Sequence, residues 1–257
     1  MHSRKHPVAA GCFFEIHSLP MTPEVFVAST SFRFFGPSFA VPQLWLYWLY
    51  RSPALMGWME RWNTRLPVPL HPALRSLLCI PRMSTLAMGT LLRECVAQMP
   101  AGSAYVNIGV WHGFSILAGM AGNADRRCIG VDNFSEFGGP RDAFLARFKC
   151  RASPHHSFYE MDYRDYFSSV HRGPIGCYFY DGSHTYEDQL EGLQAAEPFF
   201  VAGTLVLIDD TNWEAPRNAM EEFLRTSLRR YERILDIRTA RNNHPTWWNG
   251  LIVLRSF

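Results

Sequence analysis

The sequence predicts a doubly wound α/β fold, in which helices flank a mostly parallel sheet of seven strands. From Ser84 onward, short apolar runs alternate with segments of helical periodicity, which is typical of such folds. Residues 177–210 form the clearest strand, helix, strand unit, and its two strands end in acid at Asp181 and at Asp209 with Asp210. Because a right-handed crossover leaves such strands parallel, both acidic ends are expected at one carboxyl edge of the sheet.

The composition is that of a globular protein. Hydrophobic residues make up 47% of the 257 residues and charged residues 19%, which argues against extensive disorder. The net charge is +2 and the sequence has no basic block that could follow a phosphate backbone, so we expect a small-molecule partner and no nucleic acid. The richest apolar segment, residues 39–50, is far shorter than the roughly 20 residues that span a bilayer, so no membrane partner is expected.

The cysteines are widely spaced and form no C-x-x-C pair. This spacing predicts buried thiols in a reducing compartment, and therefore a cytoplasmic protein without a disulfide framework. The six residues are Cys12, Cys79, Cys95, Cys128, Cys150 and Cys177.

The first 83 residues differ in composition from the rest, so we expect residues 1–83 to form an N-terminal extension or cap and residues 84–257 to form the main domain. Apolar residues within 39–62 recur at helical spacing and predict one or two short, aromatic, amphipathic helices. Their apolar surface could be covered by the chain's own core, by a second subunit of a homo-oligomer, or by substrate beneath a lid. Attachment to a membrane surface is the least favoured interpretation, because the stretch lacks a Lys-rich polar face.

The remaining elements follow in order along the chain. A helix is expected over residues 84–99 with Ser84 as a possible cap, and Thr185 with Asp188 resembles a capping box at the start of a later helix. Strands are expected at 104–108, 127–131, 156–161, 177–180 and 204–208, with 231–237 and 251–254 as an antiparallel edge, and further helices run through Met120 and over 141–148, 186–196 and 215–228.

A loop with two glycines follows the first strand. Gly109 and Gly113 let the backbone turn tightly and approach a ligand, so a nucleoside-bearing cofactor could bind here, although the loop is not a G-x-G-x-x-G motif. Asp132 ends the next strand, where it could accept hydrogen bonds from a ribose diol, and Asp162 ends the third strand at a position suited to an adenine amino group. The alternative for either aspartate is a helix cap or a turn.

Three carboxylates and a histidine are expected to meet at the end of the central unit. Asp181, Asp209 and Asp210 need a cation, a proton or water to offset their repulsion, and Mg²⁺ prefers oxygen ligands. His184 follows Asp181 by three residues, and its unperturbed pKa of roughly 6.5 suits it to take a proton from a substrate hydroxyl. The alternative is that these aspartates are only solvated loop residues or caps.

These features together resemble the class I S-adenosylmethionine-dependent methyltransferases, which have a Rossmann-like fold. Over residues 84–257 the pattern is most similar to the branch that contains the macrocin and mycinamicin sugar O-methyltransferases and the cephalosporin hydroxylase-like proteins. The resemblance depends most on Asp181-Gly182-Ser183-His184 and on Asp209-Asp210.

The resemblance implies a role for each matching position. Asn107 stands where the family usually has Glu or Asp, an acid that helps to hold the ammonium group of the cofactor; an amide can still accept a hydrogen bond, but without charge assistance. The implied cofactor-binding residues are Gly109 and Gly113 at the methionine end, Ser115 at the following helix, Asp132 at the ribose, Asp162 at the adenine, and Asp181 beside them. The implied magnesium ligands are Asp181, Asp209 and Asp210, and the implied base is His184.

The expected function is therefore S-adenosylmethionine-dependent, magnesium-assisted O-methylation of a hydroxyl on a small molecule of sugar or natural-product type. One alternative is a methyltransferase of the same fold that acts on nitrogen or carboxylate without a metal. Another is a non-catalytic, partner-binding pseudoenzyme, for which Asn107 would be a sign. The methyl acceptor and the oligomeric state do not follow from any motif in the chain.

Overall fold

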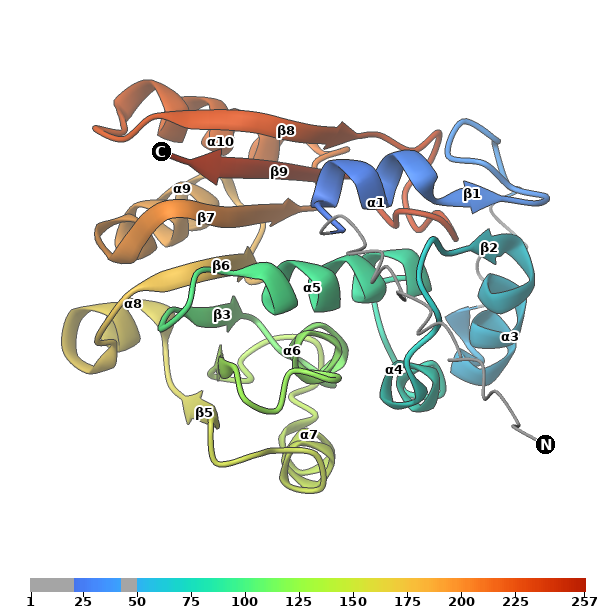
Figure 1. Ribbon diagram of the computed structural model, residues 1–257, viewed down its shortest axis with the longest axis horizontal. Helices are drawn as coiled ribbons and strands as arrows, with labels where there is room; N and C mark the ends of the chain where they lie inside the picture. The colour runs from blue at the N-terminus through green and yellow to red at the C-terminus, as the bar shows by residue number, and fades with distance from the viewer. Residues whose placement is uncertain (1–20, 43–49) are drawn as a thin grey trace, which may run out of the picture.

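The computed structural model describes residues 21–42 and 50–257. Its main sheet has the strand order β5-β4-β3-β6-β7-β9-β8, and the pairs from β5 to β7 are parallel (Figure 1). β9 is antiparallel to both of its neighbours, which confirms the predicted seven-stranded sheet with an antiparallel C-terminal edge. The strands are β3 (Ala104–Ile108), β4 (Arg127–Asp132), β5 (His156–Glu160), β6 (Ile175–Tyr180), β7 (Phe200–Asp209), β8 (Tyr231–Ile237) and β9 (Leu251–Ser256).

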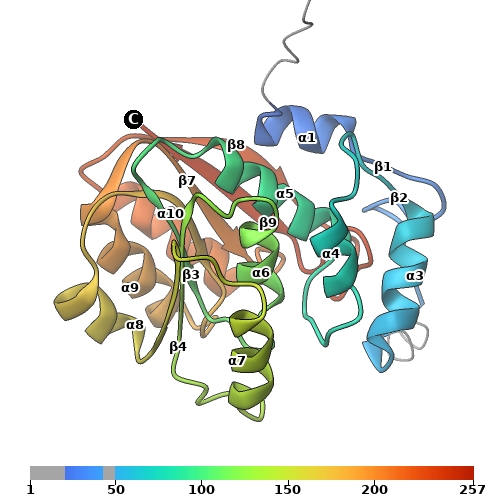
Figure 2. The same cartoon turned by 60° about the horizontal axis from the view of Figure 1, so that its bottom comes forward.

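Helices cover both faces of this sheet (Figures 1 and 2). Tyr105 and Cys177 are buried in one core with α5, α6 and α7, whereas Val106 and Tyr178 are buried in a second core with α9 and α10. Successive residues of a strand point to opposite faces, so the apolar runs fill two cores and the predicted doubly wound fold is confirmed. The helices are α5 (Leu86–Gln98), α6 (Phe114–Met120), α7 (Arg141–Lys149), α8 (Tyr163–Asp165), which continues as a π-helical turn (Tyr166–Val170), α9 (Tyr186–Ala196), which ends in a 3-10 turn (Glu197–Phe199), and α10 (Glu214–Thr226).

Two helix caps show how local sequence sets these elements. Thr185 Oγ1 accepts a hydrogen bond from the backbone N–H of Asp188 at 3.1 Å, which confirms the predicted start of α9. At α5 the cap is Thr85 and not Ser84, because Thr85 Oγ1 accepts from the N–H of Met88 at 3.3 Å and also donates to a buried carbonyl. Ser84 lies one residue too early for this bond.

The described part of the first 83 residues packs beside α5. Phe26, Met56 and Leu74 are buried in the same core as that helix. The two short outer helices were not predicted, although each begins with a capping residue before proline, at Thr22 and at His71. The predicted helical stretch within residues 43–49 lies outside the described residues. The elements are α1 (Pro23–Ser29), β1 (Ser31–Phe32), α3 (Pro53–Asn63), β2 (Thr64–Arg65) and α4 (Pro72–Leu77).

The cysteines follow the prediction only in part. Cys95, Cys128 and Cys177 are buried free thiols, but Cys79 and Cys150 are exposed. These two residues follow the short surface helices α4 and α7, which turn only one side toward the core. Cys12 lies outside the described residues. None of the helices in residues 21–42 and 50–257 has the length and apolar character needed to cross a membrane.

Candidate active site

A cavity of about 660 Å³ lies at the carboxyl edge of the parallel strands. Ligands of doubly wound sheets bind at this edge, and the volume is within the range of about 300–1,000 Å³ that is usual for small-molecule pockets. The predicted site residues that line it are Gly109, Ser115, Asp132, Asp162, Asp181, His184 and Asp210.

His184 lies between two aspartates that follow neighbouring strands. Its Nε2 is 3.3 Å from Asp210 Oδ2 and 3.7 Å from Asp181 Oδ1. Because β6 and β7 are parallel neighbours, the structure brings these residues together at one edge. Asn249, from the loop before β9, donates to Asp210 Oδ1 at 2.8 Å and fixes that carboxylate from the other side.

Burial changes the protonation of this cluster. Burial raises the pKa of Asp181 to about 6 and also raises the pKa of Asp210. The pKa of Asp209 is raised well above its usual value by burial and by the negative charges of Asp210 and Asp181. Burial acts to lower the pKa of the His184 imidazole, but the Asp181 and Asp210 carboxylates outweigh it, so the pKa of His184 is raised. The cluster therefore holds a proton close to neutral pH, and His184 is placed to exchange it.

Oxygen donors of this kind suit a hard cation, and the magnesium site stays a prediction. Within the described residues, no group of three or more His, Cys, Asp or Glu side chains is placed to hold a metal ion. Asp209 is 1% exposed and lies outside the cavity wall, and its Oδ1 accepts the backbone N–H of Asp210 at 2.9 Å. The imidazole of His184 occupies the space between the other two carboxylates.

Asp132 ties the glycine loop to the end of β4. Its Oδ2 accepts the backbone N–H groups of Val110 and Trp111 at 2.7 and 2.9 Å, and its Oδ1 accepts the N–H of Phe134 at 2.7 Å. A carboxylate offers about four acceptor positions, so one remains for a ligand hydroxyl. The carboxylate thus forms the turn that the sequence offered as the alternative, and Asp132 also lines the cavity.

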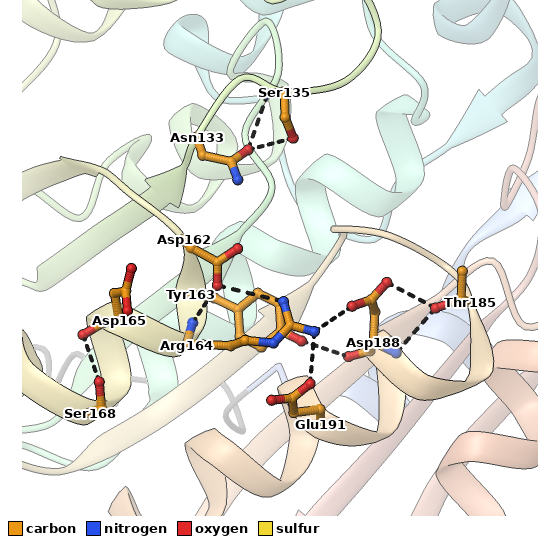
Figure 3. Close-up of polar contacts among 10 residues, drawn as sticks. All are labelled: Asn133, Ser135, Asp162, Tyr163, Arg164, Asp165, Ser168, Thr185, Asp188 and Glu191. Atoms are coloured by element: carbon orange, nitrogen blue, oxygen red, sulfur yellow. Dashed lines mark hydrogen bonds and ion pairs between the residues drawn. The ribbon is translucent and has the colours of Figure 1, made fainter.

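Asp162 belongs to a network of charged side chains at the other end of the cavity (Figure 3). Its Oδ1 accepts the backbone N–H of Arg164 at 2.8 Å, so it does cap α8. The Arg164 guanidinium lies over the ring of Tyr163 and donates to Asp188 Oδ1 at 2.6 Å and to Glu191 Oε2 at 2.7 Å. This network joins the expected adenine end of the cavity to the first turn of α9, directly after the His184 loop.

Gly109 fills a position that no other residue could occupy. Its φ is +76°, and a Cβ at this position would lie 2.0 Å from the carbonyl oxygen of Asp181. The loop after β3 and the loop after β6 therefore touch backbone to backbone, which brings the His184 loop beside the expected cofactor site.

Asn107 and Gly113, two of the predicted cofactor-binding residues, do not line the cavity. Asn107 is fully buried, and its amide donates to the carbonyls of Ile108 and Gly109 at 3.1 and 3.0 Å. Its side chain therefore supports the loop from below. Gly113 has φ +96°, and a Cβ there would meet the ring of Phe144, so this glycine serves close packing of α6 on α7.

The cavity wall also contains residues that sequence reasoning did not assign. Trp213, three residues after Asp210, packs edge-on against the His184 ring at 5.7 Å. Trp248 and Asn249 come from the loop 241–249, which connects β8 to β9. The density of Trp and Asn in that loop was the available signal.

Backbone strain in the described residues is confined to this cavity. Every non-glycine residue with positive φ there lines its wall, with φ between 44° and 58°. Bulky residues rarely adopt this conformation, and strained backbone concentrates at functional sites. The residues are Trp111, Phe134, Phe137, Asp210, Asn243 and Trp248.

Comparisons with known proteins agree with this geometry. Residues 106–211 match a family model described as a methyltransferase domain, and this range contains both the glycine loop and the acidic strand ends. No curated protein sequence matches the chain significantly.

Several solved structures share the fold. Cofactor-bound Rv0187 from MTB has a TM-score of 0.54 at 15% identity, covering 72% of this chain and 89% of that chain. The O-methyltransferase from Bacillus cereus, in complex with SAH, has a TM-score of 0.53 at 11% identity over 74% and 93% of the two chains. The O-methyltransferase TomG from Streptomyces achromogenes, in complex with SAM, has a TM-score of 0.52 at 16% identity over 74% and 92%.

At these identities the structural likeness establishes the fold alone, and the family match adds the type of domain. Residues 106–211 therefore match a methyltransferase domain, and the sheet that contains them has the fold of the class I, S-adenosylmethionine-dependent methyltransferases.

Proposed function

We propose that this methyltransferase acts on a hydroxyl group of a small molecule and that His184 is its general base. The observation that carries the proposal is the position of the imidazole, which lies 3.3 Å from Asp210 in the wall of the same cavity as Gly109 and Asp132. A base must share one cavity with the cofactor if it is to reach the acceptor while the methyl group is transferred.

The wall of the cavity fits S-adenosylmethionine (SAM). The backbone of Gly109 can approach the methionine end, Asp132 has one free acceptor position for a ribose hydroxyl, and Asp162 lies where an adenine amino group is expected. When bound, SAM supplies the methyl group that the acceptor oxygen receives. His184 takes the proton of that hydroxyl, and the Asp181 and Asp210 carboxylates stabilise the resulting imidazolium.

The aromatic part of the wall favours an acceptor that carries a ring, of the natural-product or sugar type. Trp111, Trp213 and Trp248 line the cavity together with the amides of Asn243 and Asn249. Indole rings stack on flat or apolar ligand faces, and the amides can hydrogen-bond to hydroxyl groups. An acceptor carboxylate is already ionised near neutral pH and would need no base, so it has no support from the placement of the imidazole.

Magnesium assistance is the less favoured part of the proposal. Asp181, Asp209 and Asp210 would hold the ion, which would lower the pKa of the acceptor hydroxyl. Their donor chemistry supports it, but the place of His184 between two of them opposes it. Activity after dialysis against EDTA, with and without added Mg²⁺, decides between the two forms of the mechanism.

We further assign the activity to residues 84–257 and treat residues 1–83 as an extension that completes the acceptor side. Tyr50 packs edge-on against Trp248 at 4.8 Å, and its hydroxyl donates to the carbonyl of Asn243. Arg82, at the end of the extension, also lines the cavity.

Two measurements test the proposal. Calorimetry with S-adenosylhomocysteine (SAH) should give binding to the wild type and a loss of at least roughly tenfold for Asp132→Ala. Asp142→Ala on the exposed side of α7 is the matched control and should bind like the wild type. Equal affinity for all three proteins would place the cofactor elsewhere.

The second measurement is SAH release with a panel of hydroxylated aromatic compounds and sugar nucleotides. His184→Gln should keep SAH affinity but lose about 10²-fold or more in turnover, the usual scale of general-base catalysis. Turnover by His184→Gln at the wild-type rate would mean that another group takes the proton of the acceptor hydroxyl.

A further inference from the structure

The outer side of α3 presents a row of apolar side chains to solvent. Leu55, Trp58 and Trp62 follow the spacing of one helical stripe and are 47%, 57% and 51% exposed, and the two indole rings lie 5.8 Å apart. We refer to these three residues as the α3 face. Exposed apolar patches of this kind mark sites where a protein surface contacts another protein or a membrane.

The opposite side of α3 holds this face rigidly. Met56 is buried in the main core, and a Cβ on Gly57 would lie 2.7 Å from the Cβ of Leu78, so the helix packs tightly there. Glu60 forms a fully buried ion pair with Arg82 at 2.6 Å. The α3 face therefore cannot turn inward without breaking these contacts.

Positive charge surrounds the α3 face. Arg33, Arg61 and Arg65 are exposed, and none of them forms an ion pair within the described part of the chain. Arg33 and Arg65 lie at the C-terminal end of α3, because the backbone N–H of Arg33 donates to Asn63 and because β1 pairs with β2.

No acid in this region is free to balance that charge. Residues 21–83 contain six arginines and two glutamates, a net charge of +4. Both glutamates are already engaged, Glu60 with Arg82 and Glu24 with Arg255.

We propose that the α3 face docks on an anionic membrane surface, with Trp58 and Trp62 at the level of the lipid headgroups and Arg61 and Arg65 beside the lipid phosphates. Tryptophan is favoured at that depth, and each arginine near an anionic surface contributes about 1 kcal/mol. A second copy of the chain fits the face less well, because a twofold contact would bring the same arginines together. The sequence alone predicted no membrane partner, since periodicity does not reveal which side of α3 the fold leaves free.

Co-sedimentation of the full chain with vesicles tests this proposal. The protein should bind vesicles of phosphatidylcholine containing roughly one-third phosphatidylglycerol, should bind pure phosphatidylcholine much less, and should be released by high salt. Binding should shift the tryptophan emission to shorter wavelength. Arg61→Gln with Arg65→Gln should weaken binding by about fivefold for each charge removed.

The double variant Trp58→Ser, Trp62→Ser should lose vesicle binding while its melting temperature and SAH affinity stay at the wild-type values. Leu228→Ser, at a fully exposed apolar residue before β8, is the control and should bind vesicles normally. Wild-type binding by the tryptophan variant, or no preference for anionic vesicles, would overturn the proposal. A doubled mass in light scattering that the tryptophan variant loses would also overturn it, in favour of a second copy as the partner.

Discussion

Arg164 Nη2 lies 2.6 Å from Asp188 Oδ1, so one ion pair joins α8, which follows β5, to the first turn of α9. The same Asp188 carboxylate accepts a hydrogen bond from Thr185 Oγ1 at 2.9 Å. Arg164 also lies 3.6 Å from Asp162 Oδ1 (Figure 3). Arg164 thereby braces the loop that carries His184 against the Asp162 end of the cavity.

Replacing Arg164 should therefore reduce the affinity for SAH more than the stability of the fold. We expect Arg164→Gln to weaken SAH binding by about tenfold, measured by calorimetry, and to cost less than about 1 kcal/mol in the free energy of unfolding, because partly exposed ion pairs contribute little. Arg141→Gln breaks a comparable ion pair with Glu160 on the same strand, outside the cavity, and should leave SAH affinity unchanged. Equal effects of the two variants would contradict the bracing role.

Gly109 should not tolerate alanine. The added Cβ would meet the Asp181 carbonyl at 2.0 Å, so the loops after β3 and β6 must move apart, and we expect Gly109→Ala to lose SAH binding as well as stability. Gly102→Ala is the matched control, because Gly102 has a similar φ of +78° but no neighbour within 4 Å of the added Cβ. The control should cost only about 1 kcal/mol, the strain of a positive φ. Urea denaturation and calorimetry compare the stability and the SAH affinity of the two variants. Similar losses in both would show that the strain of a positive φ, and not the contact with Asp181, causes the loss.

His171 should make stability depend on pH. Burial lowers the pKa of His171 to about 4, and the ring is held between the Tyr166 hydroxyl at 2.8 Å and the Gly173 carbonyl at 3.0 Å. The unfolded chain, with a His pKa of roughly 6.5, binds this proton more readily than the folded protein does. The contribution to stability is therefore complete above pH 6.5 and is lost as the pH falls toward about 4, amounting to about 3 kcal/mol.

Urea denaturation between pH 7 and pH 4 measures this contribution. The free energy of unfolding should fall less steeply with decreasing pH in His171→Gln than in the wild type, whereas His155→Gln, at an exposed position, should keep the wild-type slope. Parallel curves for wild type and His171→Gln would refute the assignment.

Replacing only one residue of the buried ion pair between Glu60 and Arg82 should lower the free energy of unfolding strongly. Both side chains are fully buried, and burial raises the pKa of Glu60 to about 7 in spite of the arginine. Glu60→Gln leaves the Arg82 charge without a counter-ion and should cost about 3–5 kcal/mol in thermal or urea unfolding. Replacing both residues with methionine should cost much less, and a larger loss in the double variant than in Glu60→Gln would mean that the pair is net stabilising.

The sheet and its order of elements were predictable because they depend on local patterns. Apolar runs of strand length predicted all seven strands of the main sheet, and the acids at Asp132, Asp162, Asp181 and Asp210 mark where four of them end. Parallel connection then places those ends at one edge whatever the side chains are. The cap of α5 was misplaced by one residue, since local preference favours Ser84 as the cap, whereas the buried bond from Thr85 to the Thr246 carbonyl depends on the fold.

Sequence alone determined that a glycine loop, four acidic strand ends and His184 would meet at one edge of a doubly wound sheet. Only the tertiary structure decided what each side chain contacts there. Asn107 lies beneath the loop, because its amide satisfies the carbonyls of a strand end that packing has buried. Trp213 and Asn249 reach the histidine and Asp210 from segments whose patterns carry no such information. Periodicity reports which residues share an element, whereas contacts between elements depend on packing that no local pattern encodes.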